Sequence, residues 1–312
     1  MAERVRYLTE FQDSARWDDF TLRPDDIIVS PPAKCGTTWM QTICTLLVHQ
    51  APELPQPLAE LSPWLEMLTR PLDEVVRDLD AQPHRRVIKS HTPLDGLPWH
   101  DTVTYITVGR DPRDVAISMD HHDQNFDEAA FARARRRTLG EAAGDDEAPV
   151  EPDDPDAKVR FWQWVDKDVP PQESGSSLLR TLRHLDTYWQ ARDRENVVLV
   201  HFADLRGDLE GSMRALATRL GIDVDEARWP ALVKAATFDD MRAHADRLAP
   251  NTDTQLFRDP TEFFHAGTSG QWRALLDADD LRRYEARVDA LASPELVRWV
   301  HHGDWPPGAT SS

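Results

Sequence analysis

A lysine, a glycine and two threonines follow a short apolar run near the start of the chain. The run is 27–29, and Lys34, Gly36 and Thr37-Thr38 come after it, at the head of a helix-compatible stretch over 37–50. A strand, a tight turn and a helix in this order bring backbone N–H groups and one cation to a helix N-terminus. The stretch is therefore predicted to bind a phosphate-bearing ligand. It is not a Walker A loop, because that pattern places lysine directly after the second glycine.

Three more side chains suited to this chemistry follow predicted strands. Lys89 and His91 close a strand over 86–91, and Arg110 follows a strand over 103–108. In open parallel sheets, ligands bind at the carboxyl ends of the strands, so these groups are expected in the same crevice as Lys34. Histidine suits proton transfer near neutral pH, and arginine binds phosphate in bidentate fashion.

The order of the predicted elements indicates the fold class. A fourth strand is expected over 196–202, with helices over 58–68, 178–193, 207–221 and 226–236. Alternating strands and helices predict an α/β protein with a central parallel sheet covered by helices on both faces. Residues 1–312 are read as a single three-layer domain, and the stretch 127–157, rich in Asp and Glu, is read as a mobile insertion or, equally, as a solvated loop.

Composition excludes several classes of protein. The formal net charge of -19 argues against binding to nucleic acid or to an anionic membrane. The two cysteines, Cys35 and Cys44, are poorly placed to form a disulfide, which favours a reducing compartment. No signal peptide or membrane span is expected, so the prediction is a cytoplasmic protein. Adjacent histidines, His121-His122 and His301-His302, are read as non-metal, because neighbours on a helix point about 100° apart.

Four stretches in this order resemble elements of the cytosolic-type sulfotransferases. Residues 32–39 (PAKCGTTW) resemble PKSGTTW, and residues 89–93 (KSHTP) resemble KTHLP. Residues 108–118 resemble the segment in which an Arg and a Ser bind the donor's 3′-phosphate, and residues 263–272 (FFHAGTSGQW) resemble FxRKGxxGDW. The resemblance spans about residues 25 to 275 and implies a P-loop nucleotide-binding-like fold.

The resemblance also implies an activity. Sulfotransferases of this family move a sulfuryl group from 3′-phosphoadenosine 5′-phosphosulfate (PAPS) to a hydroxyl, here of an alcohol, phenol or glycolipid acceptor. His91 is expected to act as general base, with Lys34 and Lys89 supplying positive charge, so no metal is expected. The acceptor pocket is expected to be apolar and aromatic. Its candidate lining residues are Trp64, Met67, Phe126, Phe161 and Trp162.

The donor site implied by the resemblance is spread over the whole chain. Its expected residues are Lys34, Cys35, Gly36, Thr37, Thr38, Trp39, Arg110, Ser118, Phe202, Thr237, Phe238, Met241, Phe264, His265 and Gly267. Phe238 is read either as an adenine contact or as ordinary helix packing.

Three positions depart from the family pattern. The family's Arg-Lys pair falls on His265-Ala266, its adenine-side tyrosine on Phe202, and a serine on Cys35. Arg258 and Arg273 are candidates to replace the missing cations. Two other readings stay open: a P-loop-type small-molecule kinase, and a catalytically silent nucleotide-binding protein, which the missing cations favour. The oligomeric state is not predicted.

Overall fold

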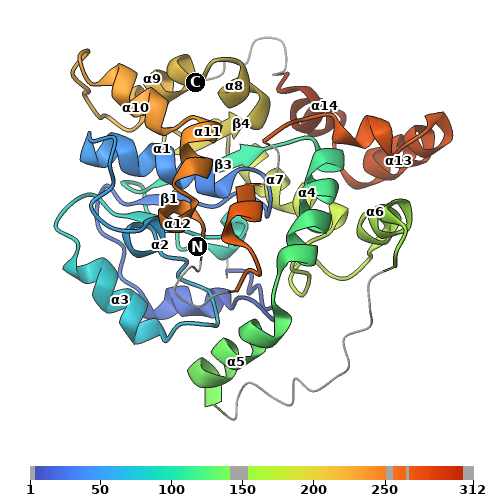
Figure 1. Ribbon diagram of the computed structural model, residues 1–312, viewed down its shortest axis with the longest axis horizontal. Helices are drawn as coiled ribbons and strands as arrows, with labels where there is room; N and C mark the ends of the chain where they lie inside the picture. Colours follow the sequence, from blue (N-terminus) through green and yellow to red (C-terminus); the bar gives the residue numbers. More distant parts are fainter. Residues whose placement is uncertain (1–3, 141–153, 251–255, 265–266, 305–312) are drawn as a thin grey trace.

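The computed structural model describes residues 4–140, 154–250, 256–264 and 267–304. Within them, one parallel sheet runs through the centre in the order β2-β1-β3-β4, flanked by helices (Figure 1). The strands are β1 (Ile27–Val29), β2 (Val87–Lys89), β3 (Thr104–Gly109) and β4 (Val197–His201). The predicted α/β class, the parallel sheet and the position of every strand are confirmed.

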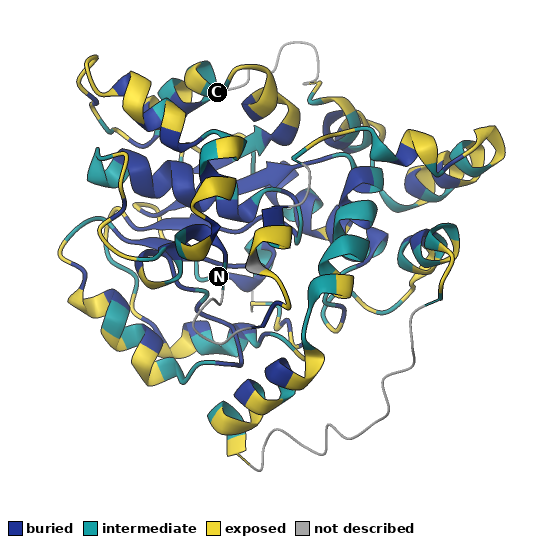
Figure 2. Ribbon diagram, in the orientation of Figure 1, coloured by how far each residue is buried: buried dark blue, intermediate teal, exposed yellow. Residues whose placement is uncertain are grey.

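The strands are buried on both faces, which explains why they read as continuous apolar runs rather than alternating ones. In β1, Ile27 and Val29 pack into one cluster and Ile28 into another. Figure 2 shows the strands and most of the following helix in dark blue, the colour of buried residues. The chain goes from β1 to β2 on one side and returns to β3 on the other. In open α/β sheets the ligand crevice opens at the carboxyl ends where the strand order reverses in this way.

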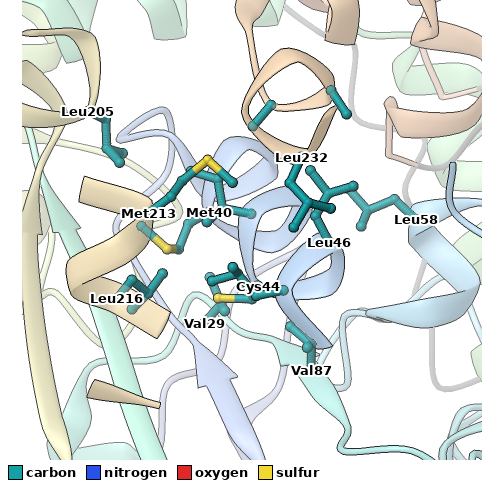
Figure 3. Close-up of a cluster of buried hydrophobic side chains, with 14 of the residues drawn as sticks. Val29, Met40, Cys44, Leu46, Leu58, Val87, Leu205, Met213, Leu216 and Leu232 are labelled. Carbon is teal, nitrogen blue, oxygen red and sulfur yellow. The ribbon is translucent and has the colours of Figure 1, made fainter. Parts of the chain in front are cut away.

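One face of the sheet is covered by the helix that follows β1 and by helices of the second half. Their bounds are α1 (Thr37–His49), α2 (Leu58–Leu61), α8 (Phe202–Gly207), α9 (Leu209–Arg219), α10 (Trp229–Ala235), α11 (Phe238–Ala243) and α12 (Ala245–Leu248). Figure 3 shows the core of this face, where Met40 and Cys44 of α1 lie among side chains from β1, β2, α8, α9 and α10.

The other face and one end of the sheet hold the remaining helices. These are η1 (Ser14–Asp19), α3 (Leu72–Ala81), η2 (Leu94–Gly96), α4 (Pro112–Asn125), α5 (Glu128–Leu139), α6 (Ala157–Asp166), α7 (Leu178–Trp189), η4 (Pro260–Phe264), η5 (Gln271–Ala274), α13 (Ala278–Leu291) and α14 (Pro294–His302), where η marks a 3₁₀ helix. Of these, η4 also packs against α11 and α12 of the first face. Asp111 caps α4 with Pro112 in its first turn, and Ser177 caps α7.

Some predicted helix limits are wrong. The helix expected over 58–68 ends at Leu61, and beyond it Trp64 pairs with Lys89 along the edge of β2. Pro63 favours this ending, because proline removes a helical N–H donor. The expected helix over 178–193 ends at Trp189, and the helix expected over 207–221 is preceded by the separate helix α8. In the stretch 127–157, most of the first part is helix α5, and residues 141–153 lie outside the described residues.

Candidate active site

The turn between β1 and α1 opens the helix N-terminus toward the crevice. Lys34 adopts φ 63°, and Gly36 occupies the N-cap position of α1 at φ 100° with no side-chain cap. A Cβ at Gly36 would lie 3.1 Å from the ring of Phe202, so both the backbone angle and the close approach require glycine. The N-terminal amides of α1 are therefore not capped by a side chain of the turn and suit an anion.

Three cations of this edge lack an ion pair in the part of the chain that the structure describes. Lys34, Lys89 and Arg110 form no ion pair with any carboxylate among the described residues. Burial, with the nearby charge of Arg110, lowers the pKa of Lys34 to about 8, and burial lowers the pKa of Lys89 to about 8. Lys89 and Arg110 are buried and Lys34 is half-buried. A cluster of such cations without ion pairs costs folding free energy and marks a site that an anionic ligand would stabilise.

Arg110 joins the turn to a distant loop. Its Nη1 donates to the carbonyl oxygen of Lys34 at 2.8 Å, and its Nη2 donates to that of Thr268 at 3.1 Å. The guanidinium carbon lies 4.4 Å from the centre of the Phe202 ring. Arg110 Nε and Thr37 Oγ1 are buried without a hydrogen-bond partner in the described part of the chain. Unsatisfied buried donors of this kind fit a ligand rich in acceptor oxygens, such as a phosphate or sulfate.

His91 is held in one tautomer. Its Nδ1 lies 2.8 Å from the carbonyl oxygen of Pro31, which can only accept, so the proton is on Nδ1 and Nε2 carries the free lone pair. Burial, followed by the charge of Lys89, lowers the pKa of His91 to about 3. The imidazole is therefore neutral over the whole physiological range and able to accept a proton at Nε2.

The C-terminal loop is fixed to the start of α4. The carboxylate of Asp114 accepts from the amides of Gly270, at 2.8 Å and 2.9 Å, and Gln271, at 3.2 Å. Gly267 has φ 58°, and a Cβ there would lie 2.6 Å from the ring of Phe238. Phe238 in turn meets Phe264 edge to face at 6.3 Å between ring centres. The predicted segments 237–241 and 263–267 therefore lie together, although His265 falls outside the described residues.

The remaining predicted donor residues occupy two places. Trp39 donates through Nε1 to the carbonyl oxygen of Ala236 at 2.7 Å, directly before Thr237, which caps α11. Its ring meets that of Phe202 edge to face at 5.4 Å between centres. Met241 is 2% exposed and belongs to the core. Ser118 lies half-buried in α4, two helical turns after Asp111.

Other predicted groups have local roles or lie elsewhere. Thr38 and Cys35 are buried, Cys35 and Cys44 are free, and burial raises the pKa of the Cys35 thiol to about 12. Arg258 is engaged with the carbonyl oxygen of Gln124 at 2.9 Å, and Arg273 lies over the ring of Trp272. Neither arginine contacts the residues that surround Lys34 in these interactions.

The family of the chain follows from comparison with known proteins. A family model described as the sulfotransferase domain matches residues 24–295, most of the chain. The chain belongs to the sulfotransferase family. A glycolipid sulfotransferase of Mycobacterium bovis is 40% identical over 318 residues, covering 97% of this chain and 96% of that protein. As a member of this family, the enzyme transfers a sulfuryl group from PAPS to an acceptor hydroxyl.

Solved structures share the fold of this sulfotransferase. A retinol dehydratase in complex with retinol and 3′-phosphoadenosine 5′-phosphate (PAP) superposes with a TM-score of 0.67 at 20% identity, covering 94% of this chain and 86% of that one. A mouse sulfotransferase in complex with PAP gives a TM-score of 0.66 at 20% identity, covering 92% and 90%. At this identity the likeness concerns the fold, and it confirms the predicted P-loop-like architecture.

Two residues around Lys34 of the sulfotransferase were not predicted. Lys34 Nζ donates to Nδ1 of His122 at 3.4 Å and lies 4.6 Å from the centre of the Phe263 ring. Burial and the charges of Lys34 and Lys89 lower the pKa of His122 well below its usual value, so its ring is neutral and accepts. For His122, the sequence did contain a signal. Helix α4 begins just after Arg110, so one face of this helix lies along the site.

A buried carboxylate supports the turn that carries His91, and it was also not predicted. Oε1 of Glu66 accepts from Trp17 Nε1 at 2.7 Å and from the Ser90 hydroxyl, whose oxygen accepts from the amide of Thr92 at 3.0 Å. Burial raises the pKa of Glu66. Nothing in the local sequence pattern pairs position 66 with position 90.

The aromatic residues expected at the acceptor pocket separate into two groups. Trp64 meets His91 edge to face at 4.8 Å between ring centres, and Lys89 Nζ lies 4.6 Å from the centre of the Trp64 ring. Met67, Trp64 and Phe126 share one cluster. Phe161 and the partly buried Trp162 pack into a different cluster with α7, α13 and α14, apart from the cluster that holds Trp64.

The described residues hold neither a metal-binding cluster nor a membrane-spanning helix. Among the described residues, no group of three or more His, Cys, Asp or Glu side chains is arranged to hold a metal ion. In the same part of the chain, no helix is both long and apolar enough to cross a membrane.

Proposed function

We propose that the sulfotransferase acts by direct in-line transfer with His91 as general base. The observation that carries this proposal is the hydrogen bond between His91 Nδ1 and the Pro31 carbonyl oxygen, which leaves Nε2 as the proton acceptor. In the step, the acceptor oxygen forms a bond to sulfur while the bond between sulfur and the 5′-phosphate oxygen breaks. The hydroxyl proton goes to His91 Nε2, and the electron pair of the broken bond stays on the phosphate.

Lys34 and Lys89 supply positive charge to this step. Lys34 stabilises the developing charge on the leaving phosphate oxygen, and Lys89 stabilises the transferring sulfuryl group. Both stand at the crevice without a carboxylate partner among the described residues, so their charge is available to the donor and is already in place when the bond breaks. The reaction is proposed to need no metal ion.

Binding of the donor also changes the pKa of the base, His91. In the free enzyme, burial and, after it, the charge of neighbouring cations hold the pKa of His91 at about 3. Negative charge on bound PAPS offsets Lys89 and Lys34 and raises the pKa of His91, which makes it a stronger base only when the donor is present. Binding of the donor thereby prepares the acceptor step.

The rest of the donor site is proposed from the sequence match, and the positions of its residues in the fold support it. The unpartnered Arg110 Nε and Thr37 Oγ1 suit phosphate oxygens, with Ser118 nearby on α4. Trp39 and Phe238 are proposed to contact adenine, and Gly267 to contribute a backbone amide. The acceptor is proposed to be a hydroxyl of a glycolipid-like molecule, as in the mycobacterial relative. The free, buried cysteines support a cytoplasmic location.

An acceptor screen with sulfur-labelled PAPS tests the proposal. Label should pass to a glycolipid or alkyl glycoside in the presence of a chelator, and PAP should form in equal amount. Phosphoryl transfer from ATP that requires Mg²⁺ would instead support a kinase. Tight binding of PAP without transfer to any acceptor would support a catalytically silent protein.

A further inference from the structure

A small hollow of about 10 Å³, the space of about one water molecule, opens beside His91. It is lined by the turn that carries Lys34 and by the start of α7. The lining residues are Pro32, Ala33, His91, Gly175, Ser176, Arg180, Thr181 and His184. Apart from the two imidazoles, none of these side chains is aromatic, and none is a large aliphatic group. The hollow therefore differs from the aromatic surface around Trp64, which lies against the same histidine.

Arg180 is the charged group of this hollow. It is 5% exposed, its Nη2 donates to the carbonyl oxygen of His91 at 2.9 Å, and its guanidinium lies 4.4 Å from the centre of the Tyr7 ring. Its Nη1 is buried without a hydrogen-bond partner in the described part of the chain. Burial lowers its pKa to about 10, so it remains protonated at neutral pH.

No carboxylate of the described residues forms an ion pair with Arg180, in contrast to its neighbour Arg183, which pairs with Asp95 and Asp186. A buried guanidinium with an unused N–H is costly unless something completes its hydrogen bonds. Because the unused group belongs to a residue that lines the hollow, an oxygen atom of a bound molecule is a suitable partner.

The other polar walls favour a single hydroxyl group as the occupant. Ser176 Oγ accepts from Trp164 Nε1 at 2.8 Å, which leaves its own hydrogen free to donate. His184 Nε2 donates to the carbonyl oxygen of Ser30 at 2.7 Å, and burial lowers the pKa of this imidazole well below its usual value, so the ring is neutral. Arg180 is then the only cation among the residues that line the hollow.

We propose that Arg180 binds a hydroxyl oxygen of the acceptor that neighbours the hydroxyl being sulfated. The reacting end of the acceptor is then a sugar-like polyol, and any apolar tail lies elsewhere. Because Arg180 is bonded to the backbone of His91, the distance between the base and the bound hydroxyl is fixed by the fold. This assignment rests on the proposed function, in which His91 deprotonates the acceptor, and it narrows the acceptor class.

Octyl glucoside and octanol form the test pair, because they share an apolar tail and differ in the sugar. With Arg180→Met, the ratio of kcat/KM for octyl glucoside to that for octanol should fall about 10- to 100-fold, the value of a hydrogen bond to a charged group. Most of this fall should come from a higher KM for octyl glucoside. The control Arg183→Met removes an exposed arginine of the same helix and should leave the ratio unchanged.

Monodeoxy analogues of octyl glucoside identify the contact. In the wild-type enzyme, one analogue should lose about 10- to 100-fold in kcat/KM relative to the parent, and in Arg180→Met that analogue and the parent should perform alike. Arg180→Lys keeps the charge and should give the same pattern with a smaller loss. It also serves if Arg180→Met does not fold.

Binding measurements separate this inference from the proposed function. Calorimetry should show that octyl glucoside binds the complex of the enzyme with PAP, and that Arg180→Met weakens this binding. If the glucoside binds in this way but no label is transferred from PAPS, the proposed function fails, while the contact between Arg180 and a sugar hydroxyl stands. An equal loss for octyl glucoside and octanol, or the absence of any loss, overturns the inference. An equal loss would assign Arg180 to positioning of His91 alone.

Discussion

In the described part of the chain, buried cations are paired at the amino ends of the strands, here called the amino edge of the sheet, and unpaired at the carboxyl ends, the carboxyl edge. At the amino edge, Arg86 is fully buried, its Nε and Nη2 donate to the two carboxylate oxygens of Asp26 at 2.8 Å and 2.5 Å, and its Nη1 reaches Asp80 at 3.1 Å. Three residues later, at the carboxyl end of β2, Lys89 is 8% exposed and has no such partner among the described residues.

This difference in the pairing of cations separates the edge that stabilises the fold from the edge that carries the reaction. A buried cation that is fully paired adds to the stability of the fold only while both partners are present. Buried and half-buried cations without an ion pair, such as Lys34, Lys89 and Arg110 at the carboxyl edge, reduce stability until a ligand binds. The fold thus keeps one neutralised edge and one edge prepared for an anion.

The largest expected effect belongs to the carboxyl edge. Replacing His91 with Ala should lower kcat about 10²- to 10⁴-fold, because the general base is lost. Stability should change little, since the substitution removes one hydrogen bond worth about 1 kcal/mol. Steady-state assays with PAPS and a chosen acceptor measure kcat, and urea unfolding measures the free energy of unfolding. Retained turnover in the variant would rule out His91 as the base.

The amino edge should respond in the opposite sense. Arg86→Met leaves the Asp26 carboxylate buried without its partner, so the free energy of unfolding should fall by about 3–5 kcal/mol. The folded fraction should keep its kcat. The control Arg77→Met breaks an exposed pair with Asp73 and should cost less than about 1 kcal/mol. A loss of kcat in the folded Arg86 variant, without loss of stability, would contradict the division between the edges.

Proton uptake gives a smaller but direct signature of the unpaired cations. With pKa values of about 8, Lys34 and Lys89 are each about half protonated at pH 8 in the free enzyme. A bound anion raises both pKa values, so binding of PAP at pH 8 should take up about one proton, and much less at pH 6.5. Calorimetry in buffers of different ionisation enthalpy measures the uptake. Proton release at pH 8 would contradict the assignment.

The sequence alone predicted the parts of the site that local patterns decide. The turn at Lys34 was recognisable because glycine, threonine and an apolar run lie within ten residues, and the strand ends because buried parallel strands read as apolar runs. The helices α13 and α14 were not predicted, although their starts carry clear signals: a capping box at Asp277 and Ser293 followed by Pro294.

What escaped prediction depends on contacts between distant segments. Arg180 reaches the backbone of His91 across 89 positions, and Glu66 reaches Ser90 from a stretch predicted to be helical. Hydrophobicity identified Trp64 and Phe161 equally well as candidates, but only tertiary packing assigns the first to the site and the second to the cluster with α13 and α14.

Titration of the enzyme with PAP tests most directly whether the carboxyl edge is a prepared anion site. The account predicts that one PAP binds per chain without Mg²⁺, and that Lys34→Met weakens binding about 10- to 100-fold. The control Lys158→Met removes a lysine paired with Asp277 and Asp280 and should bind PAP as the wild type does. Absence of PAP binding by the wild type, or equal affinity in Lys34→Met, would contradict the account.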